Sequence, residues 1–145
     1  PPSAPTPTLI PGETVAFEVI AQSIGGCEEP YKAVALVATT AGEFAQLWSL
    51  QVTDSASKPP MVDFDHFAVM LVTNICDDSF YSIEVKNIVR LQDGSLIVYV
   101  EAPHQKWEEG ANAEVVSWNQ FVTIPQDVVP SAETDLSLIV YVTFR

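Results

Sequence analysis

A single dipeptide, Asp93-Gly94, constrains the fold more than any other feature of the sequence. It separates two apolar segments, residues 79–91 and residues 96–102. An Asp-Gly pair supplies the positive φ that a tight hairpin turn requires, and alternating apolar and polar flanks are typical of strands. We therefore expect the two segments to form an antiparallel hairpin.

The same strand pattern recurs along most of the chain. In residues 15–21 the larger residues Val15, Phe17 and Val19 alternate with Ala16, Glu18 and Ile20, which is the period of a strand with one face better buried than the other. Further strand-length apolar segments lie at residues 31–40, 67–73, 115–125 and 136–145. After Asn87 the alternation changes phase, which predicts a β-bulge there. We expect a mainly β fold, an antiparallel sandwich or flattened barrel of about seven strands, with any parallel or mixed pairing among the early strands.

One short helix is predicted at residues 41–50. Thr40 and Glu43 have the spacing of a capping box, in which the first side chain caps the helix and the second reaches back. Apolar residues then recur at helical spacing as far as Trp48, so one helical face can pack on a sheet. We expect the helix to cover an end or an edge of the β structure, with Trp48 in the core.

The first residues have a different composition. Residues 1–13 contain five prolines, which disfavour a helix and favour extended chain. We expect residues 1–13 to be a Pro-rich linker and residues 14–145 to form a single β-rich domain with one core. Such leaders often follow a signal peptide, a lipid anchor or another domain. The expected location is therefore extracellular or the bacterial cell envelope, with lipid anchoring upstream of residue 1 as one alternative.

The acidic charge of the chain limits its partners. There are 19 acidic and 6 basic residues, which give a net charge of -13. Such a charge repels phosphate backbones and anionic lipids. No apolar run approaches the roughly 20 residues that span a bilayer. We expect no nucleic-acid binding, no direct membrane insertion, and a protein partner that is basic or is a protease.

The two cysteines, Cys27 and Cys76, leave two alternatives. Each stands beside turn-like residues. A disulfide between them closes a loop of about 50 residues and contributes roughly 3 to 4 kcal/mol in the chain-entropy model. The alternative is two unrelated thiols. The sequence has no C-x-x-C motif and no histidine near either cysteine, so nothing indicates a zinc or redox site. We expect no cofactor.

The polar residues Asp63, Asp65 and His66 stand directly before the apolar segment 67–72. In an extended segment Asp63 and Asp65 share one face, while Phe64 and His66 share the other. Two carboxylates are too few for calcium, which takes about six to eight oxygen ligands. Paired acids could also serve a glycosidase, but no nucleophile, phosphate-loop or zinc-protease motif is present. We expect a structural role, no metal and no enzymatic activity.

Between residues 33 and 125 the order of features resembles the carboxy-terminal domain of the protease-complex subunit PrcB family. Asp63-Phe64 before a hydrophobic strand and Tyr-Ser-Ile at 81–83 carry the resemblance. Where typical members have a Thr-Gly-Gly turn, this chain has a different sequence at 76–80. The resemblance implies a non-catalytic, exported or envelope-associated domain that binds a protein and helps a protease complex. It also implies that Asp63-Phe64 is a structural signature.

Two functions remain as alternatives. The first is a protein-interaction domain anchored by a loop aromatic residue, Trp107, or by Trp118 in a predicted strand. The second is a carbohydrate-binding module in which Trp107 stacks on a sugar ring. Its hydroxyl-binding residues would be Gln105, Glu109 and Asn112. The sequence leaves the partner and the oligomeric state open.

Overall fold

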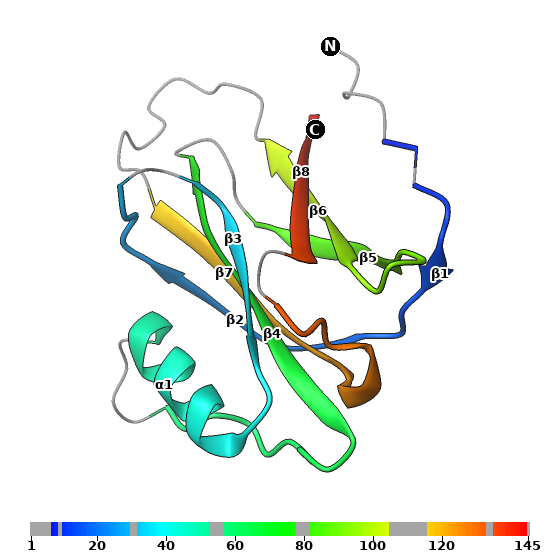
Figure 1. Cartoon of the computed structure of the whole chain (residues 1–145). Coiled ribbons are helices and arrows are strands. Elements are labelled where there is room, and N and C mark those ends of the chain that lie inside the picture. Colours follow the sequence, from blue (N-terminus) through cyan, green and yellow to red (C-terminus); the bar gives the residue numbers. More distant parts are fainter. Residues whose placement is uncertain are drawn as a thin grey trace.

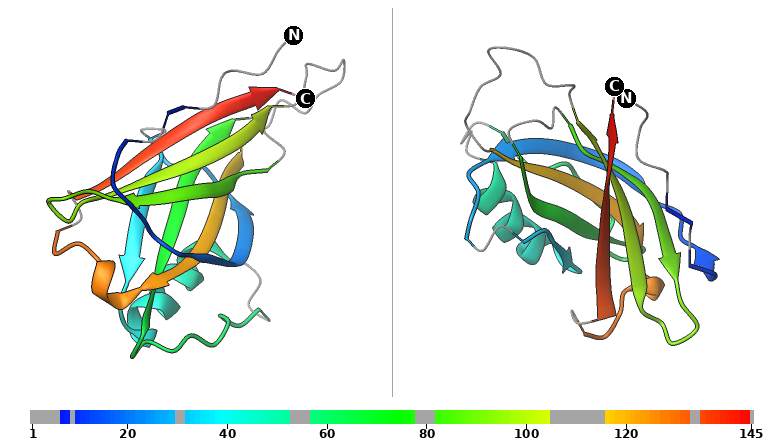
Figure 2. Two further views of the ribbon diagram at one scale, coloured as in Figure 1. Left: turned by 90° about the vertical axis from the view of Figure 1, so that its right-hand side faces the viewer. Right: turned by 90° about the horizontal axis from the view of Figure 1, so that it is seen from above.

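The computed structural model describes residues 7–8, 10–29, 32–52, 57–77, 82–104, 116–132 and 135–144. Within these ranges, eight strands form two four-stranded sheets that pack face to face, with one α-helix outside them (Figure 1). The predicted mainly β sandwich with one helix is confirmed. Figure 2 shows the sheets as two layers, with the helix on the outer side of one of them.

Sheet A has the strand order β1-β5-β6-β8. The bounds of its strands are β1 Glu13–Thr14, β5 Glu84–Arg90, β6 Leu96–His104 and β8 Leu136–Phe144. The predicted hairpin joins β5 to β6, and Gly94 in its turn has a φ of 89°. The β5 register shifts between Val85 and Asn87, which confirms the predicted bulge. The parallel pair involves the last strand, since β8 runs parallel to β6, so our expectation for the early strands was wrong.

Sheet B has the strand order β2-β7-β4-β3, with every pair antiparallel. The bounds of its strands are β2 Glu18–Gly25, β7 Val116–Pro125, β4 Phe67–Asp77 and β3 Val34–Ala38. The apolar segment 67–73, which was predicted to be a strand, belongs to β4, and β4 lies in the middle of the sheet between β7 and β3. A short 3-10 helix, Gln126–Val128, follows β7. The third and fourth strands of each order, β6 and β8 in sheet A and β4 and β3 in sheet B, lie toward the same side of the sandwich (Figure 1).

The core lies between the inner faces of the two sheets. Its side chains are almost all aliphatic, including Ala68, Met70, Val98, Val100 and Val122. Gln120 of β7 is buried among them. Its Oε1 accepts a hydrogen bond from Val85 N at 2.8 Å, and its Nε2 donates to Ile83 O at 3.3 Å. Because both ends of the amide are paired, Gln120 links the two sheets without leaving a buried polar group unsatisfied.

The helix α1, Ala41–Gln51, begins at the predicted cap. Thr40 Oγ1 accepts a hydrogen bond from Glu43 N at 3.2 Å. The Glu43 carboxylate reaches back to Thr39, whose backbone N and Oγ1 both donate to it at 2.9 Å. The bonds from the Glu43 carboxylate therefore go to Thr39, one residue before the helix cap Thr40. No helix of the described residues is long and apolar enough to cross a membrane.

The helix α1 covers the outer face of sheet B, rather than an end or an edge as we expected. The rings of Phe44 and Trp48 lie 5.9 and 5.1 Å from the ring of Phe121 in β7, measured between centroids. Phe44 is buried, and Trp48 is half-buried against the same cluster. A broad aromatic stripe of this kind needs a flat apolar surface, which a sheet face offers and a strand edge does not.

The end of the predicted linker belongs to sheet A. Glu13 in β1 pairs with Arg90 in β5, and Ile10 N donates a hydrogen bond to the Tyr99 hydroxyl at 2.9 Å. Gly12 lies so close to β5 that a methyl group on its Cα would stand 2.6 Å from Arg90 O. This segment therefore packs along the β5 edge and fits there only because residue 12 is a glycine.

Candidate functional site

Residues 63–66 form a turn, not the extended segment that the sequence predicted. Asp63 O accepts hydrogen bonds from His66 N and Phe67 N at 3.1 and 2.9 Å. Its Oδ1 accepts a hydrogen bond from Asp65 N at 3.1 Å, and its Oδ2 lies 2.6 Å from His66 Nδ1. The turn therefore pairs Asp63 with His66, which the expected extended segment would have placed on opposite faces.

The Asp63–His66 pair lies in solvent, with 55% and 75% of the two side chains exposed. Their hydrogen bond lowers the pKa of Asp63 and raises the pKa of His66. Across the described part of the chain, no group of three or more His, Cys, Asp or Glu side chains could hold a metal ion. Phe64 packs against Phe44, with ring centroids 6.1 Å apart, so this turn anchors the entry to β4.

The predicted aromatic binding site lies outside the described residues, since it consists of Gln105, Trp107, Glu109 and Asn112. The carbohydrate-binding alternative that depends on Trp107 therefore stays a prediction. Trp118 is described in β7, where its half-buried ring packs against the core. Its indole nitrogen is buried and has no hydrogen-bond partner among the described residues. Trp118 is a core side chain rather than an exposed anchor.

Cys27 and Cys76 form a disulfide that joins the loop after β2 to the end of β4. Two residues before Cys76, Asn74 interrupts the β4 register with a φ of 60°. Its Nδ2 donates to Glu28 O and Lys32 O at 3.1 and 2.9 Å, and its Oδ1 accepts from Glu28 N at 3.0 Å. Asparagine tolerates this backbone conformation better than most residues. The disulfide and Asn74 together fix the loop between β2 and β3 on sheet B.

The outer face of sheet B changes character where α1 ends. Under the helix the face is apolar, with Val69, Leu71 and Phe121. Further along the same strands it carries Thr73 and Asn119, whose Oγ1 and Oδ1 lie 2.6 Å apart in a hydrogen bond. Asn119 also accepts from Ser117 Oγ and donates to Ser23 Oγ. This part of the face is polar although buried, and its groups are satisfied by one another.

A pocket of about 430 Å³ lies over this polar part of the face, and we call it the loop pocket. Its apolar wall consists of Val34 and Leu36 from β3 and Leu50 from α1. The pocket is also lined by Glu28 and Glu29 from the loop between β2 and β3. The volume is within the range of about 300–1,000 Å³ that is usual for ligand pockets. No pattern in the sequence indicated that these residues form a pocket. The one local sign is Asn74, an asparagine inside an otherwise apolar strand.

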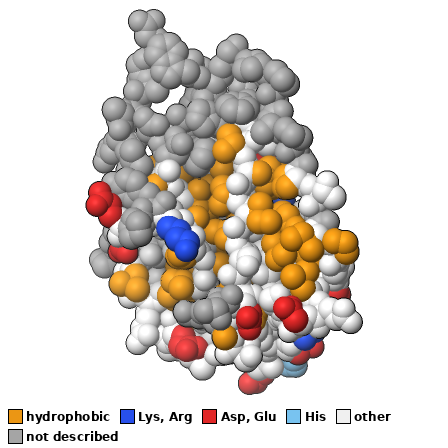
Figure 3. Space-filling view, turned by 45° about the horizontal axis from the view of Figure 1, so that its top comes forward, with side chains coloured by type: hydrophobic (Ala, Val, Ile, Leu, Met, Phe, Trp, Pro, Cys, Tyr) orange, Lys and Arg blue, Asp and Glu red, His pale blue; other side chains and the backbone are white. Residues whose placement is uncertain are grey.

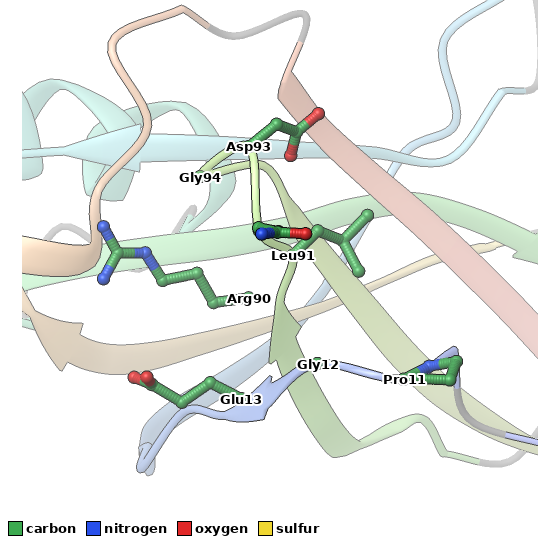
Figure 4. A pocket seen from close by; sticks show the side chains of 8 residues that line it. Pro11, Gly12, Glu13, Arg90, Leu91, Asp93 and Gly94 are labelled. Carbon is green, nitrogen blue, oxygen red and sulfur yellow. The ribbon is translucent and has the colours of Figure 1, made fainter.

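A second hollow, of about 680 Å³, lies between residues 11–13 and the β5–β6 turn at residues 90–94 (Figure 4). In Figure 4 the side chains of Arg90 and Glu13 extend to the same side, away from Leu91. The carboxylate of Asp93 extends to the other side in the same view, so the three charged groups do not converge on one point. It is a weaker candidate than the loop pocket, whose walls are held together by a disulfide and hydrogen bonds.

The strands β3 and β8 contact each other and form the free edges on one side of the sandwich. β8 is nine residues long, contains no charged residue and pairs with β6 without a register shift. On its inner face Leu138 and Val140 pack on the core, and on its outer face Ile139 and Tyr141 pack on sheet A. All four are half-buried. Figure 3 shows hydrophobic side chains gathered over the part of the surface where sheet A lies.

No family model, curated protein or solved structure matches this chain. Strand edges and pockets are the surface features on which a functional proposal can be based. Two of them differ from the rest of the described surface. Among the described residues, β8 pairs with β6 alone and carries apolar side chains beside its outer edge, and the loop pocket offers a cavity next to the disulfide.

Proposed function

We propose that this is a non-catalytic protein-binding domain that binds an extended segment of a partner protein along β8. The observation that carries the proposal is the β8 edge, which pairs with no further strand among the described residues and is long, uncharged and regular, with apolar side chains on both faces. A free edge presents a row of backbone N–H and C=O groups that another strand can pair with. In such strand addition the main chain supplies affinity and alternate side chains supply specificity.

The charge of the protein favours a neutral or basic partner segment over a second copy. Each copy carries a net charge of -13, so two copies repel each other over the distance at which they would dock. β8 itself adds no charge to this repulsion. The expected partner segment alternates apolar residues with neutral or basic residues and lacks acidic residues.

We also infer that the domain acts outside the cytoplasm, in the cell envelope or the exterior. The Cys27–Cys76 disulfide supports this location, because structural disulfides persist in oxidising compartments. The resemblance to the PrcB family extends the proposal to an accessory role in a protease complex. Alkylation of intact cells tests the location. We expect both cysteines to react only after a reductant is added, and free thiols in freshly lysed cells would contradict it.

Selection from a displayed library of random linear peptides tests the strand-binding function. We expect the selected peptides to alternate apolar residues and to lack acidic residues. Binding of these peptides should fall by about tenfold or more in Ile139→Lys and also in Ile139→Glu, because a charge of either sign in the middle of an edge strand blocks pairing. The matched control is Ile24→Lys in β2, an edge strand of sheet B, where Ile24 is 53% exposed. This variant should bind as the parent does.

Three outcomes would overturn the proposal. The first is that no peptide is enriched on the parent domain. The second is that the selected peptides bind Ile139→Lys as tightly as the parent. The third is that the parent forms a dimer in sedimentation experiments which Ile139→Lys abolishes, since β8 would then pair with a second copy.

A further inference from the structure

The loop pocket is lined by two kinds of side chain. Val34 and Leu50 are 37% and 72% exposed, although both are large apolar residues. Such residues at the wall of a cavity can contact the aliphatic part of a ligand. Glu28 and Glu29 also line the pocket, are exposed and carry negative charge. The pocket therefore suits a molecule with an aliphatic stem and a positively charged end.

The negative charge of the loop pocket is not neutralised within the described structure. There, no basic side chain forms an ion pair with Glu28 or Glu29. The helix α1 ends at the pocket with Leu50 and Gln51, and its last turn has no basic residue. The carbonyl end of a helix carries a partial negative charge. Lys32 is the one cationic residue in the pocket wall, so negative charge predominates.

The walls of the loop pocket are fixed before any ligand binds. The disulfide and the Asn74 amide hold the loop that carries the two glutamates. Gly25 and Gly26 keep space open. A methyl group on Gly26 would meet no atom within 4 Å, and one on Gly25 would approach only Asn119 Nδ2 at 3.7 Å and Gln51 Oε1 at 3.9 Å. A preformed cavity loses little conformational freedom on binding, which favours even a small ligand.

We propose that the loop pocket binds the side chain of a lysine or arginine from a partner protein. The aliphatic stem lies against Val34, Leu36 and Leu50, and the cationic end lies toward Glu28, Glu29 and the end of α1. This site is on the outer face of sheet B and includes no residue of β8. It can therefore exist whether or not a strand binds at the β8 edge.

Amide NMR spectra of the ¹⁵N-labelled domain test the proposal with three probes. The first is N-acetyl-lysine methylamide, and the second is N-acetyl-norleucine methylamide, which has the same aliphatic stem without the charge. The third is cadaverine, a free diamine. We expect the lysine compound to shift the signals of Gly25, Gly26 and Leu50, and to bind at least about fivefold more tightly than the norleucine compound.

A matched pair of double variants locates the binding. Glu28→Gln with Glu29→Gln should weaken binding of the lysine compound at least about fivefold. Glu18→Gln with Glu84→Gln makes the same change in net charge elsewhere and should leave binding unchanged. Equal binding of the lysine and norleucine compounds, or equal weakening in both double variants, would overturn the proposal. Cadaverine that binds more tightly than the lysine compound would assign the pocket to free amines and would also overturn it.

Discussion

The edge strands on the two sides of the sandwich differ in length, charge and regularity. On one side β1 has only two residues and contains Glu13, and β2 contains Glu18 and a register shift between Val19 and Ala21. On the other side β8 has nine residues with no charge and no shift. Short strands, charges and bulges are the usual means of preventing unwanted pairing. Their presence on one side and their absence from β8 are consistent with the proposal that β8 pairs with a partner strand.

The strand β3 connects the two candidate sites. Val34 and Leu36 form part of the loop pocket on the outer face of sheet B. The edge of β3 adjoins β8 on the open side of the sandwich. It is five residues long and uncharged, so it is protected only by its shortness. Both of the surfaces that we propose for binding therefore include or adjoin the side of the sandwich formed by β3 and β8.

The largest stability effect should come from the disulfide, which anchors the chain at the end of the protected strand β2. Replacing both Cys27 and Cys76 by serine should lower the free energy of unfolding by about 3 to 4 kcal/mol, because the open chain gains conformational freedom when it unfolds. Urea denaturation measures this value. Reduction of the parent protein should cause a similar loss of stability. If reduction caused no such loss, the structural role of the disulfide would be contradicted.

A smaller effect is expected from Gly12→Ala, which tests the protection of the β5 edge by β1. The added methyl group would stand 2.6 Å from Arg90 O, so the segment must move away from β5, at a cost of about 1–3 kcal/mol. We expect the variant to unfold at lower urea concentration and to self-associate, as measured by sedimentation. Gly26→Ala is the matched control, since its methyl group would meet no atom within 4 Å.

A still smaller effect on stability is expected from the charge on β8. Ile139→Lys should change the free energy of unfolding by about 1 kcal/mol, because the side chain is half-buried at an edge and a lysine can extend into solvent. Its effect on peptide binding should be much larger. If the variant lost peptide binding only in proportion to its lost stability, the proposed difference in binding between the two sides of the sandwich would be contradicted.

The smallest effect should come from the Asp63–His66 turn, which lies on neither edge. The pKa of His66 is raised above its ordinary value of 6.5, so its stabilising effect is complete below that pH and is lost as pH rises through the raised pKa. The pKa of Asp63 is lowered from 3.8, so its effect is complete above that pH and is lost as pH falls through the lowered pKa. Imidazole NMR titration should show the His66 pKa returning toward its ordinary value in Asp63→Asn.

Local features of the fold could be predicted from the sequence. The Asp93-Gly94 turn and the cap at Thr40 depend on residues within a few positions of each other, and both are present. The placement of β8 beside β6 could not be predicted, because a parallel pair depends on the whole topology rather than on a turn. The buried Gln120 was missed for a similar reason, since its partners in and before β5 are more than 30 residues away.

The candidate sites were less accessible to prediction than the fold. The loop pocket brings together Gly25, Leu50 and Asn74 from three separate segments, and no local pattern indicates that they meet. The turn at Asp63 was predicted as extended because its hydrogen bonds to the backbone leave no mark in the alternation of residues. The apolar character of β8 on both faces was visible in the sequence, but only the topology shows that it is an edge strand.

Backbone methylation of a selected peptide tests the central claim most directly. In an added strand, alternate N–H groups point toward β8 and the others point away. Two versions of the peptide, N-methylated at alternate positions in the two possible phases, should therefore differ. We expect one version to lose about a hundredfold in affinity, from several lost hydrogen bonds of about 1 kcal/mol each, and the other to bind like the unmodified peptide. Equal affinities for the two versions would contradict binding by strand addition at β8.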